Sequence, residues 1–422
     1  MNQLKKLGAI GGAISLALCW PLAVGQIGHN VIHDGVKKLN NASLKAEIVK
    51  YERGYLTSQV ETHFTVIDPE LIQQLKTDGL PTDFTVKSDV EHGVISLSAH
   101  SVLEGEQEIP LTLDTQTQLN GNTQFELNLD TWHFTSGGEN PVTVSTTPAY
   151  LKGHATVLGL GGYTLDVPSV ELDFASGEKM TLTDVKGEGD GKQQEGFWLG
   201  DQTIQVGNLM LTENDDTAKF ELKQASYHFN SSEDVQQKRL NSVHQLKAQQ
   251  VVMPDGNVND FNVDFALGDL DSVSFLKLMN LYRNSPQLTD SDIQQAIPYI
   301  ETLFSKGFYL SMNQMKMTLG SGEFESQWKL NVPEGTNNVS KNPALIVPAL
   351  TGHLNTFFSN ELVAEYPFIR ESIDEAIVME MITQNDKGYT INAELINGNV
   401  VFENGHQVPL MALLLPMMMQ KR

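Results

Sequence analysis

The sequence predicts a mainly β protein of the α+β class. The expected fold is a long, curved antiparallel β-meander that forms a groove, with helices in the C-terminal third and an N-terminal membrane helix. Three observations support it. Apolar and polar residues alternate with a period of two from about residue 44 to 267, the signature of half-buried antiparallel strands. Beyond that point the apolar spacing becomes helical, and an uncharged apolar run stands near the start of the chain.

That apolar run covers residues 7–25, and it follows Lys5 and Lys6. No charged residue occurs after Lys6 until Asp34. A spanning helix needs about 20 apolar residues and a signal peptide about 7–15, so the length alone fits both. The positive-inside rule keeps residues 1–6 as a cytoplasmic basic tip and places the rest of the chain on the outer side.

Three interpretations of the run remain open: a retained signal anchor, a signal peptide cleaved after Gly25, and a lipoprotein acylated at Cys19. We expect the retained anchor. Trp20 suits a membrane interface, and Leu18 is bulky where an acylation box has a small residue.

Composition narrows the classes of function. The formal net charge of −24 disfavours nucleic acid as a direct partner, because polyanions repel an acidic surface. Cys19 is the only cysteine in the chain, so the exported part forms no disulfide and no thiolate metal site.

The sequence divides into five segments. Residues 1–6 and 7–25 are the tip and the anchor, and residues 26–43 are a stalk that ends at Asn40-Asn41. Residues 44–268 are the antiparallel β body, in which turn signals such as Asn120-Gly121 and Asp255-Gly256 separate the alternating runs. Residues 269–422 are a mixed C-terminal part that continues the β body.

The C-terminal part is predicted element by element. Val273, Leu276, Met279 and Tyr282 indicate a helix, and Ser291 with Gln294 indicates a capping box that starts a second one. The elements expected after these are a hairpin over 307–332, helices over 343–358 and 360–383, a hairpin turning at Asn397-Gly398, and a terminal helix over 409–419.

Six residues near the start of the β body form a candidate structural or binding cluster: Tyr51, Arg53, Gly54, Ser58, His92 and Gly93. Gly54 suits a turn that needs positive φ, and Arg53 could pair with a carboxylate or a head group. We expect this cluster to serve structure or binding, mainly as an anchored first hairpin.

Four features together carry a resemblance to a known family. They are the segment Tyr51–Val60, the tripeptide Glu91-His92-Gly93, the change from strand to helix between Leu270 and Tyr282, and the closing Ile396-Asn-Gly-Asn-Val400. In this order they resemble the YdgA/YihF-like bacterial envelope proteins, a family with a domain of unknown function. The resemblance implies an inner-membrane anchor with a periplasmic body in a Gram-negative cell. It supplies no catalytic residues.

The residues themselves indicate no catalytic, cofactor or metal site. His29 and His33 stand four apart but have no third ligand nearby. The glycines at Gly159-Leu-Gly161-Gly162 are not followed by the helix that a phosphate loop needs, and Gly187–Gly191 lacks the closing Glu of a calcium loop. We therefore expect a protein that is not an enzyme and needs no cofactor.

The sequence favours a non-catalytic protein, anchored in the inner membrane with its body in the periplasm, that holds a lipid or other apolar ligand in a β groove. Strand Phe261–Leu267, with its alternating apolar side chains, is typical of such a surface. The alternative is an envelope scaffold or assembly protein that acts through contacts with another envelope protein or through self-association as a homo-oligomer.

Overall fold

A computed structural model describes residues 36, 40 and 43–413 except 54–56, 78–80, 93–95, 105–108, 119, 139, 195, 215–216 and 285–288. The chain forms two compact units. Unit 1 comprises residues 1–193 and 204–219, and unit 2 comprises residues 194–203 and 220–422. The predicted anchor over 7–25 lies outside the described residues, and within them no helix has the length and apolar character to cross a membrane.

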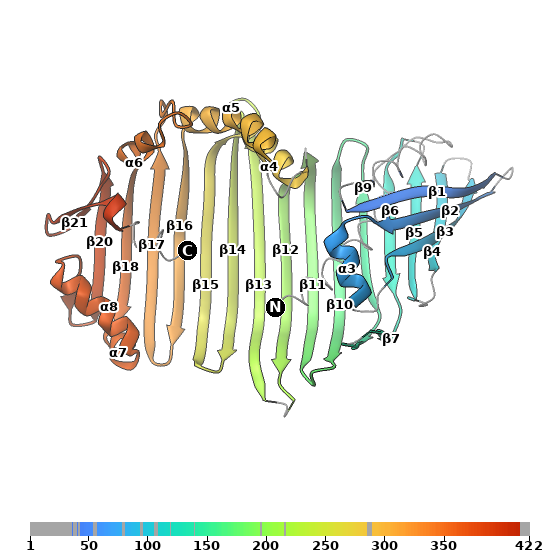
Figure 1. Ribbon diagram of the computed structural model, residues 1–422, viewed down its shortest axis with the longest axis horizontal. Coiled ribbons are helices and arrows are strands. Elements are labelled where there is room, and N and C mark those ends of the chain that lie inside the picture. Colours follow the sequence, from blue (N-terminus) through green and yellow to red (C-terminus); the bar gives the residue numbers. More distant parts are fainter. Residues whose placement is uncertain are drawn as a thin grey trace. The chain divides into compact units, whose positions relative to one another are not determined.

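Unit 1 is an antiparallel sheet whose strands pair mostly in chain order (Figure 1). β9 pairs with β6, and both β8 and β9 pair with β10, at different ends of that long strand. The strands are β1 (Leu44–Arg53), β2 (Thr57–Val66), β3 (Asp83–His92), β4 (Ser96–Glu104), β5 (Leu111–Gln118), β6 (Thr123–Leu129), β7 (Trp132–Thr135), β8 (Val142–Thr146), β9 (Ala149–Ala155), β10 (Leu160–Phe174) and β11 (Lys179–Gln194).

The core of unit 1 lies between one face of this sheet and helix α3 (Pro69–Thr77). Leu75 of α3 packs with Phe64 and Leu113, and all three are buried. Val36, from the predicted stalk, belongs to the same cluster, so this residue packs into the core. The prediction contained no helix α3. The sequence feature that indicates this helix is Asp68 followed by a proline. The Asp68 carboxylate accepts hydrogen bonds from backbone amides in the first turn of α3.

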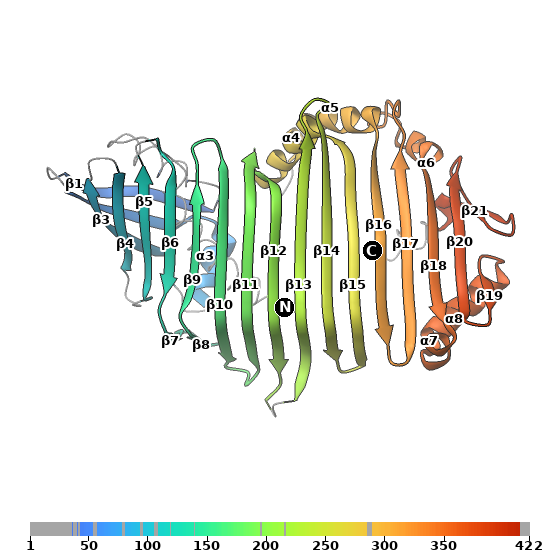
Figure 2. The same ribbon diagram turned by 180° about the vertical axis from the view of Figure 1, so that it is seen from behind.

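Unit 2 is a second antiparallel meander, continued by β19 and by the closing strands (Figures 1 and 2). Strands β12 (Phe197–Thr212) and β13 (Ala218–Asp234) contain residues of both units. The remaining strands are β14 (Arg239–Met253), β15 (Gly256–Asp271), β16 (Phe308–Leu319), β17 (Gly322–Val332), β18 (Thr351–Ser359), β19 (Thr383–Asn385), β20 (Gly388–Ile396), β21 (Asn399–Phe402) and β22 (Gln407–Pro409).

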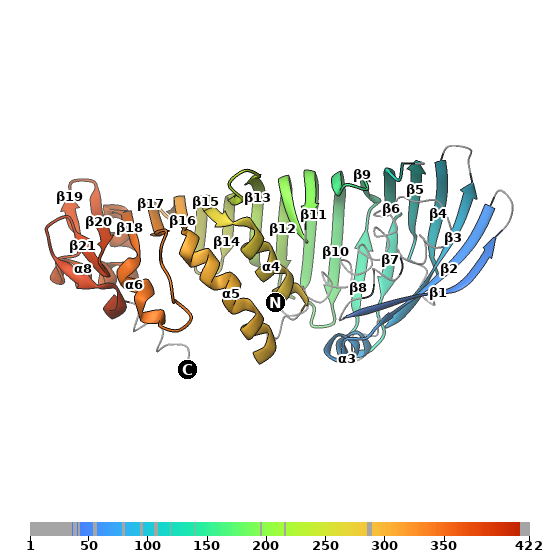
Figure 3. The same cartoon turned by 90° about the horizontal axis from the view of Figure 1, so that it is seen from above.

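Helices cover part of one face of the unit 2 sheet. α4 (Ser272–Asn284) and α5 (Asp290–Lys306) lie against the same side of β14–β16 (Figure 3). Leu303 of α5 packs with Leu240 and Leu270 of the sheet. The other helices of this unit are η2 (Pro343–Leu345), α6 (Ile346–Ala349), α7 (Asn360–Glu365) and α8 (Pro367–Val378).

Helix α7 lies so close to β17 that only glycine fits beneath it. A Cβ at Gly322 would stand 2.3 Å from the Cα of Leu362, which is well inside van der Waals contact. Leu362 is itself fully buried. This close approach fixes α7 on the same face of the sheet as Phe324, two residues farther along β17.

The mainly β, antiparallel architecture is confirmed, as are the helix at 273–282, the hairpin at 307–332 and the turn at Asn397-Gly398. The predicted helix over 343–358 is wrong beyond residue 349, because Thr351–Ser359 is strand β18. In it Leu354, Thr356 and Phe358 lie on one face of the strand, and Phe358 packs edge-on against Phe324 at 5.2 Å between ring centroids.

Two further helical predictions need correction. The helix expected over 360–383 is two helices with a break at Tyr366, where Pro367 begins α8, and it ends at Val378. The capping box lies at Thr289 and Asp292 instead of Ser291 and Gln294, so α5 starts earlier than expected. The predicted terminal helix over 409–419 lies largely outside the described residues.

Candidate functional site

The predicted special cluster maps to the first strands of unit 1. Arg53 stands opposite Ser58, and Tyr51 opposite Val60, on the paired strands β1 and β2. Ser58 is 2% exposed. His92 lies on β3, the strand next to β2. Gly54 and Gly93 lie outside the described residues. The sheet thus gathers Tyr51, Arg53 and Ser58 on one hairpin, and a binding role for them stays a prediction.

Unit 1 contains a cavity of about 780 Å³ on the face of its sheet opposite the core. Two cross-strand rows from β3, β4, β5, β6 and β9 line it. One row is Asp89, His100, Asp114, Glu126 and Lys152, and the other is Glu91, Ser98, Gln116, Gln124 and His154. The register places all these side chains on one face, because directly opposed residues point to the same side of a sheet.

Four of the side chains that line this cavity form two pairs. His100 Nδ1 lies 2.7 Å from Asp114 Oδ1, and Lys152 Nζ lies 3.0 Å from Glu126 Oε1. The cavity is therefore polar and acidic, so the apolar groove expected from the sequence is not found at this place in unit 1. Among the residues that the structure describes, no group of three or more His, Cys, Asp or Glu side chains could hold a metal ion.

Unit 2 carries two adjacent rows of mostly apolar side chains across β13, β14, β15, β16, β17 and β18. We call these two rows the apolar patch. The first row is Phe229, His244, Phe265, Met312, Trp328 and Leu354. The second row is Tyr227, Leu246, Val263, Met315, Ser326 and Thr356.

The rings in the first row lie close to one another, although Met312 stands between Phe265 and Trp328. The His244 ring centroid lies 5.0 Å from that of Phe229 and 6.2 Å from that of Phe265, and Phe265 lies 6.3 Å from Trp328. Ser326 and Thr356 satisfy each other with a 2.8 Å hydrogen bond between their hydroxyls. Because these polar atoms are paired, the patch is chemically apolar along most of its length.

The apolar patch lies on the face of the unit 2 sheet that carries the helices, between two regions that helices cover. On one side the neighbouring row packs under helices, with Leu267 in the cluster of Leu303. On the other side α7 packs on Gly322. In between, Tyr227 and Leu246 remain 36% and 42% exposed. Large apolar side chains left half-open between packed ends are typical of binding surfaces.

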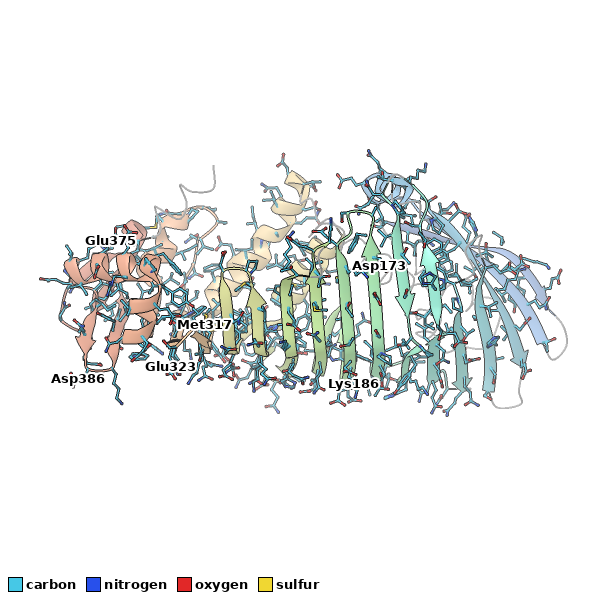
Figure 4. The ribbon with its side chains drawn as sticks, turned by 90° about the horizontal axis from the view of Figure 1, so that it is seen from below. Asp173, Lys186, Met317, Glu323, Glu375 and Asp386 are labelled. Atoms are coloured by element: carbon cyan, nitrogen blue, oxygen red, sulfur yellow. The ribbon has the colours of Figure 1, made fainter. Side chains whose placement is uncertain are left out.

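The opposite face of the same sheet is polar. Gln245 and Asn313 both donate to the Asp264 carboxylate at 2.8 Å, and Asn262 donates to Gln314 at 2.6 Å. Figure 4 shows Met317 on the side of this sheet that carries the helices and Glu323 on the other. The unit 2 sheet therefore has one polar face and one apolar face, as the alternation of apolar and polar residues in the sequence predicts.

A hydrogen-bonded pair interrupts the aromatic row. The Tyr227 hydroxyl lies 2.7 Å from Nδ1 of His244 on the adjacent strand. Burial lowers the pKa of His244 and raises the pKa of Tyr227, so both side chains are neutral near pH 7. The sequence alone does not reveal this pair, because only the strand register brings Tyr227 beside His244.

We expect the His244 pKa, measured by NMR titration of its ring protons, to lie below the ordinary 6.5. The unfolded chain then binds this proton more readily than the folded chain, so the stability linked to neutral His244 is lost as pH falls below about 6.5. A pKa above 6.5 would contradict the half-buried position of the imidazole.

Comparison with known proteins gives one positive result. No curated protein and no solved structure matches the chain. A family model described as "Bacterial protein of unknown function (DUF945)" matches residues 4–411, which is nearly the whole chain. The chain therefore belongs to the DUF945 family of bacterial proteins.

Proposed function

We propose that this protein binds the acyl chain of a lipid or a related amphiphile across the apolar patch of unit 2. The observation that carries the proposal is the apolar patch itself: two adjacent rows of mostly apolar side chains run from β13 to β18, and the patch is exposed at Tyr227 and Leu246. Sites for apolar ligands are lined mainly by aliphatic and aromatic side chains, as this patch is.

The dimensions of the patch suit an acyl chain. Neighbouring strands lie about 4.8 Å apart, so the row from β13 to β18 is about 24 Å long. A bilayer's hydrocarbon core is about 30 Å thick, so the chains of one leaflet extend about 15 Å. One acyl chain laid across the strands therefore fits within the row.

The proposal includes a location: a retained inner-membrane anchor over residues 7–25 with the body in the periplasm. The apolar run after Lys5 and Lys6 supports it, and so does the absence of further charge before Asp34. Such an anchor would keep the apolar patch beside a source of lipid.

The anchor is tested by the intact mass of the protein purified from membranes. We expect the mass of a chain that retains residues 1–25 and carries no acyl group on Cys19. A chain that starts at Gln26 would mean a cleaved signal peptide, and an acylated chain that starts at Cys19 would mean a lipoprotein. Either mass would overturn the proposed location.

The binding proposal is tested with two neighbouring residues of β14. Leu246 lies in the apolar patch, whereas Lys247 points to the opposite face, and both are exposed. Leu246→Glu and Lys247→Gln each change the net charge by one unit in the same direction. We expect Leu246→Glu to weaken binding of a fluorescent long-chain fatty acid about tenfold or more, because it places a carboxylate against the chain. Lys247→Gln should bind as the wild type does, and equal losses in both variants would refute the proposed surface.

Native mass spectrometry with lipid extraction addresses the scaffold alternative. The proposal predicts a lipid that copurifies with the full chain and is lost in Leu246→Glu. A lipid-free protein that runs as a stable oligomer would instead favour an envelope scaffold.

A further inference from the structure

We propose that Tyr227 and His244 form the element that recognises a polar acceptor group on the ligand, such as the carbonyl of an acyl ester. This inference rests on the proposed function. It adds the chemical class of the ligand, because an apolar patch with a hydrogen-bonding pair at one end selects an amphiphile over a plain hydrocarbon.

The pair always retains one unused donor. A neutral tyrosine and a neutral histidine together carry two polar hydrogens, one O–H and one N–H, and their mutual 2.7 Å bond uses one of them. If the tyrosine hydroxyl donates to Nδ1, the hydrogen on Nε2 is left over. If Nδ1 donates, the tyrosine hydrogen is left over. The conclusion does not depend on the tautomer.

The surroundings make that donor selective. Phe229 and Phe265 flank the imidazole on either side, and Leu246 follows it on the same face of β14. On β13, β14 and β15, the described residues that the register places around His244 on this face carry no charge, and Tyr227 is the one other titratable group among them. The pair therefore offers the ligand a neutral hydrogen-bond donor with apolar side chains around it. In such surroundings a donor without an acceptor costs free energy, so a ligand that supplies an acceptor is favoured.

The position of the pair also orients the ligand. Tyr227 and His244 lie on β13 and β14, at one end of the apolar patch, while Trp328 and Leu354 lie on β17 and β18 toward the other. A ligand whose carbonyl contacts the pair would lay its acyl chain toward Met312, Trp328 and Leu354. The patch thus has a polar end and an apolar end.

The test compares two probes that differ in one group: a pyrene-labelled fatty-acid methyl ester and the matching pyrene-labelled alkane. The double variant Tyr227→Phe with His244→Phe removes every hydrogen-bonding atom of the pair and keeps aromatic rings in both places. In the full-length protein we expect the affinity for the ester to fall about fivefold, the size of one neutral hydrogen bond, and the affinity for the alkane to stay unchanged.

Unchanged binding of the alkane also shows that the variant is folded. If both affinities fall together, or neither falls, the pair does not recognise the carbonyl, and the proposed acyl-chain site stands without it. If the wild-type protein binds neither probe, the proposed acyl-chain site itself is refuted, whatever the variant does. The two failures are therefore distinguishable.

Discussion

Replacing Leu240 with alanine is expected to lower the free energy of unfolding by about 2–5 kcal/mol, the cost of emptying a fully buried leucine site. Leu240 lies on β14, is 0% exposed, and packs with Leu270 and Leu303 beneath helix α5. The loss combines the transfer free energy of the removed atoms with the cavity left between sheet and helix. Urea unfolding of the full chain, followed by circular dichroism, measures it.

Val235 provides the control for Leu240. It stands in the turn between β13 and β14 and is 77% exposed. Val235→Ala should change the free energy of unfolding by less than about 0.5 kcal/mol. Equal effects of the two substitutions would mean that the helices do not pack on the sheet at Leu240.

Asp271→Ala is expected to cost about 2–4 kcal/mol, because it removes both a helix cap and the buried carboxylate that accepts a hydrogen bond from the half-exposed Lys306 ammonium. The Asp271 side chain is 2% exposed and accepts a hydrogen bond from the Ser274 amide in the first turn of α4, at 2.9 Å. The other partner is the Lys306 ammonium at the end of α5. One carboxylate therefore ties both helices to the end of β15.

The Asp271 interactions also give a pH dependence. Burial raises the pKa of Asp271, but hydrogen bonds from Lys306 and Ser274 outweigh burial and hold the pKa below its ordinary 3.8. The stability that the carboxylate contributes is present above that pH and is lost as pH falls through the lowered value. Urea unfolding at pH 7 and at acid pH should show a smaller difference between wild type and Asp271→Ala at the lower pH.

Asp269 is the matched control for Asp271. It lies two residues earlier on β15, is exposed, and has φ of 57°, a conformation that asparagine also tolerates. Asp269→Asn should leave the unfolding free energy nearly unchanged at both pH values. A comparable loss in this variant would show that charge at this end of β15, and not the buried Asp271 carboxylate, controls stability.

The local patterns in the sequence predicted most of the strands. The alternation of Phe261, Val263, Phe265 and Leu267 predicted β15, and the spacing from Val273 to Tyr282 predicted α4. Such patterns depend on neighbouring residues alone, so one sequence is enough to find them. The helix prediction for the segment 351–358 is wrong because local patterns do not determine its structure. Its strand form depends on pairing with β17 and β20, which are distant in the sequence.

The candidate site depends even more on register. The sequence predicts an apolar strand over Phe261–Leu267 and a hairpin over 307–332, which contains Met312 and Trp328. Their alignment into one row, however, follows from cross-strand pairing together with irregularities such as the shift between Met312 and Met315. The acidic cavity of unit 1 was missed for the same reason, since five separate strands supply its lining.

The central claim is that an acyl chain lies on the apolar patch, and photo-crosslinking from adjacent positions tests it most directly. Full-length protein carrying p-benzoylphenylalanine in place of Leu246, or in place of Lys247, is irradiated in the presence of phospholipid vesicles, and the covalent adducts are identified by mass spectrometry. Our account predicts a lipid adduct at position 246 and none at position 247, because the two side chains point to opposite faces of β14. Equal labelling at both positions, or no lipid at position 246, would contradict it.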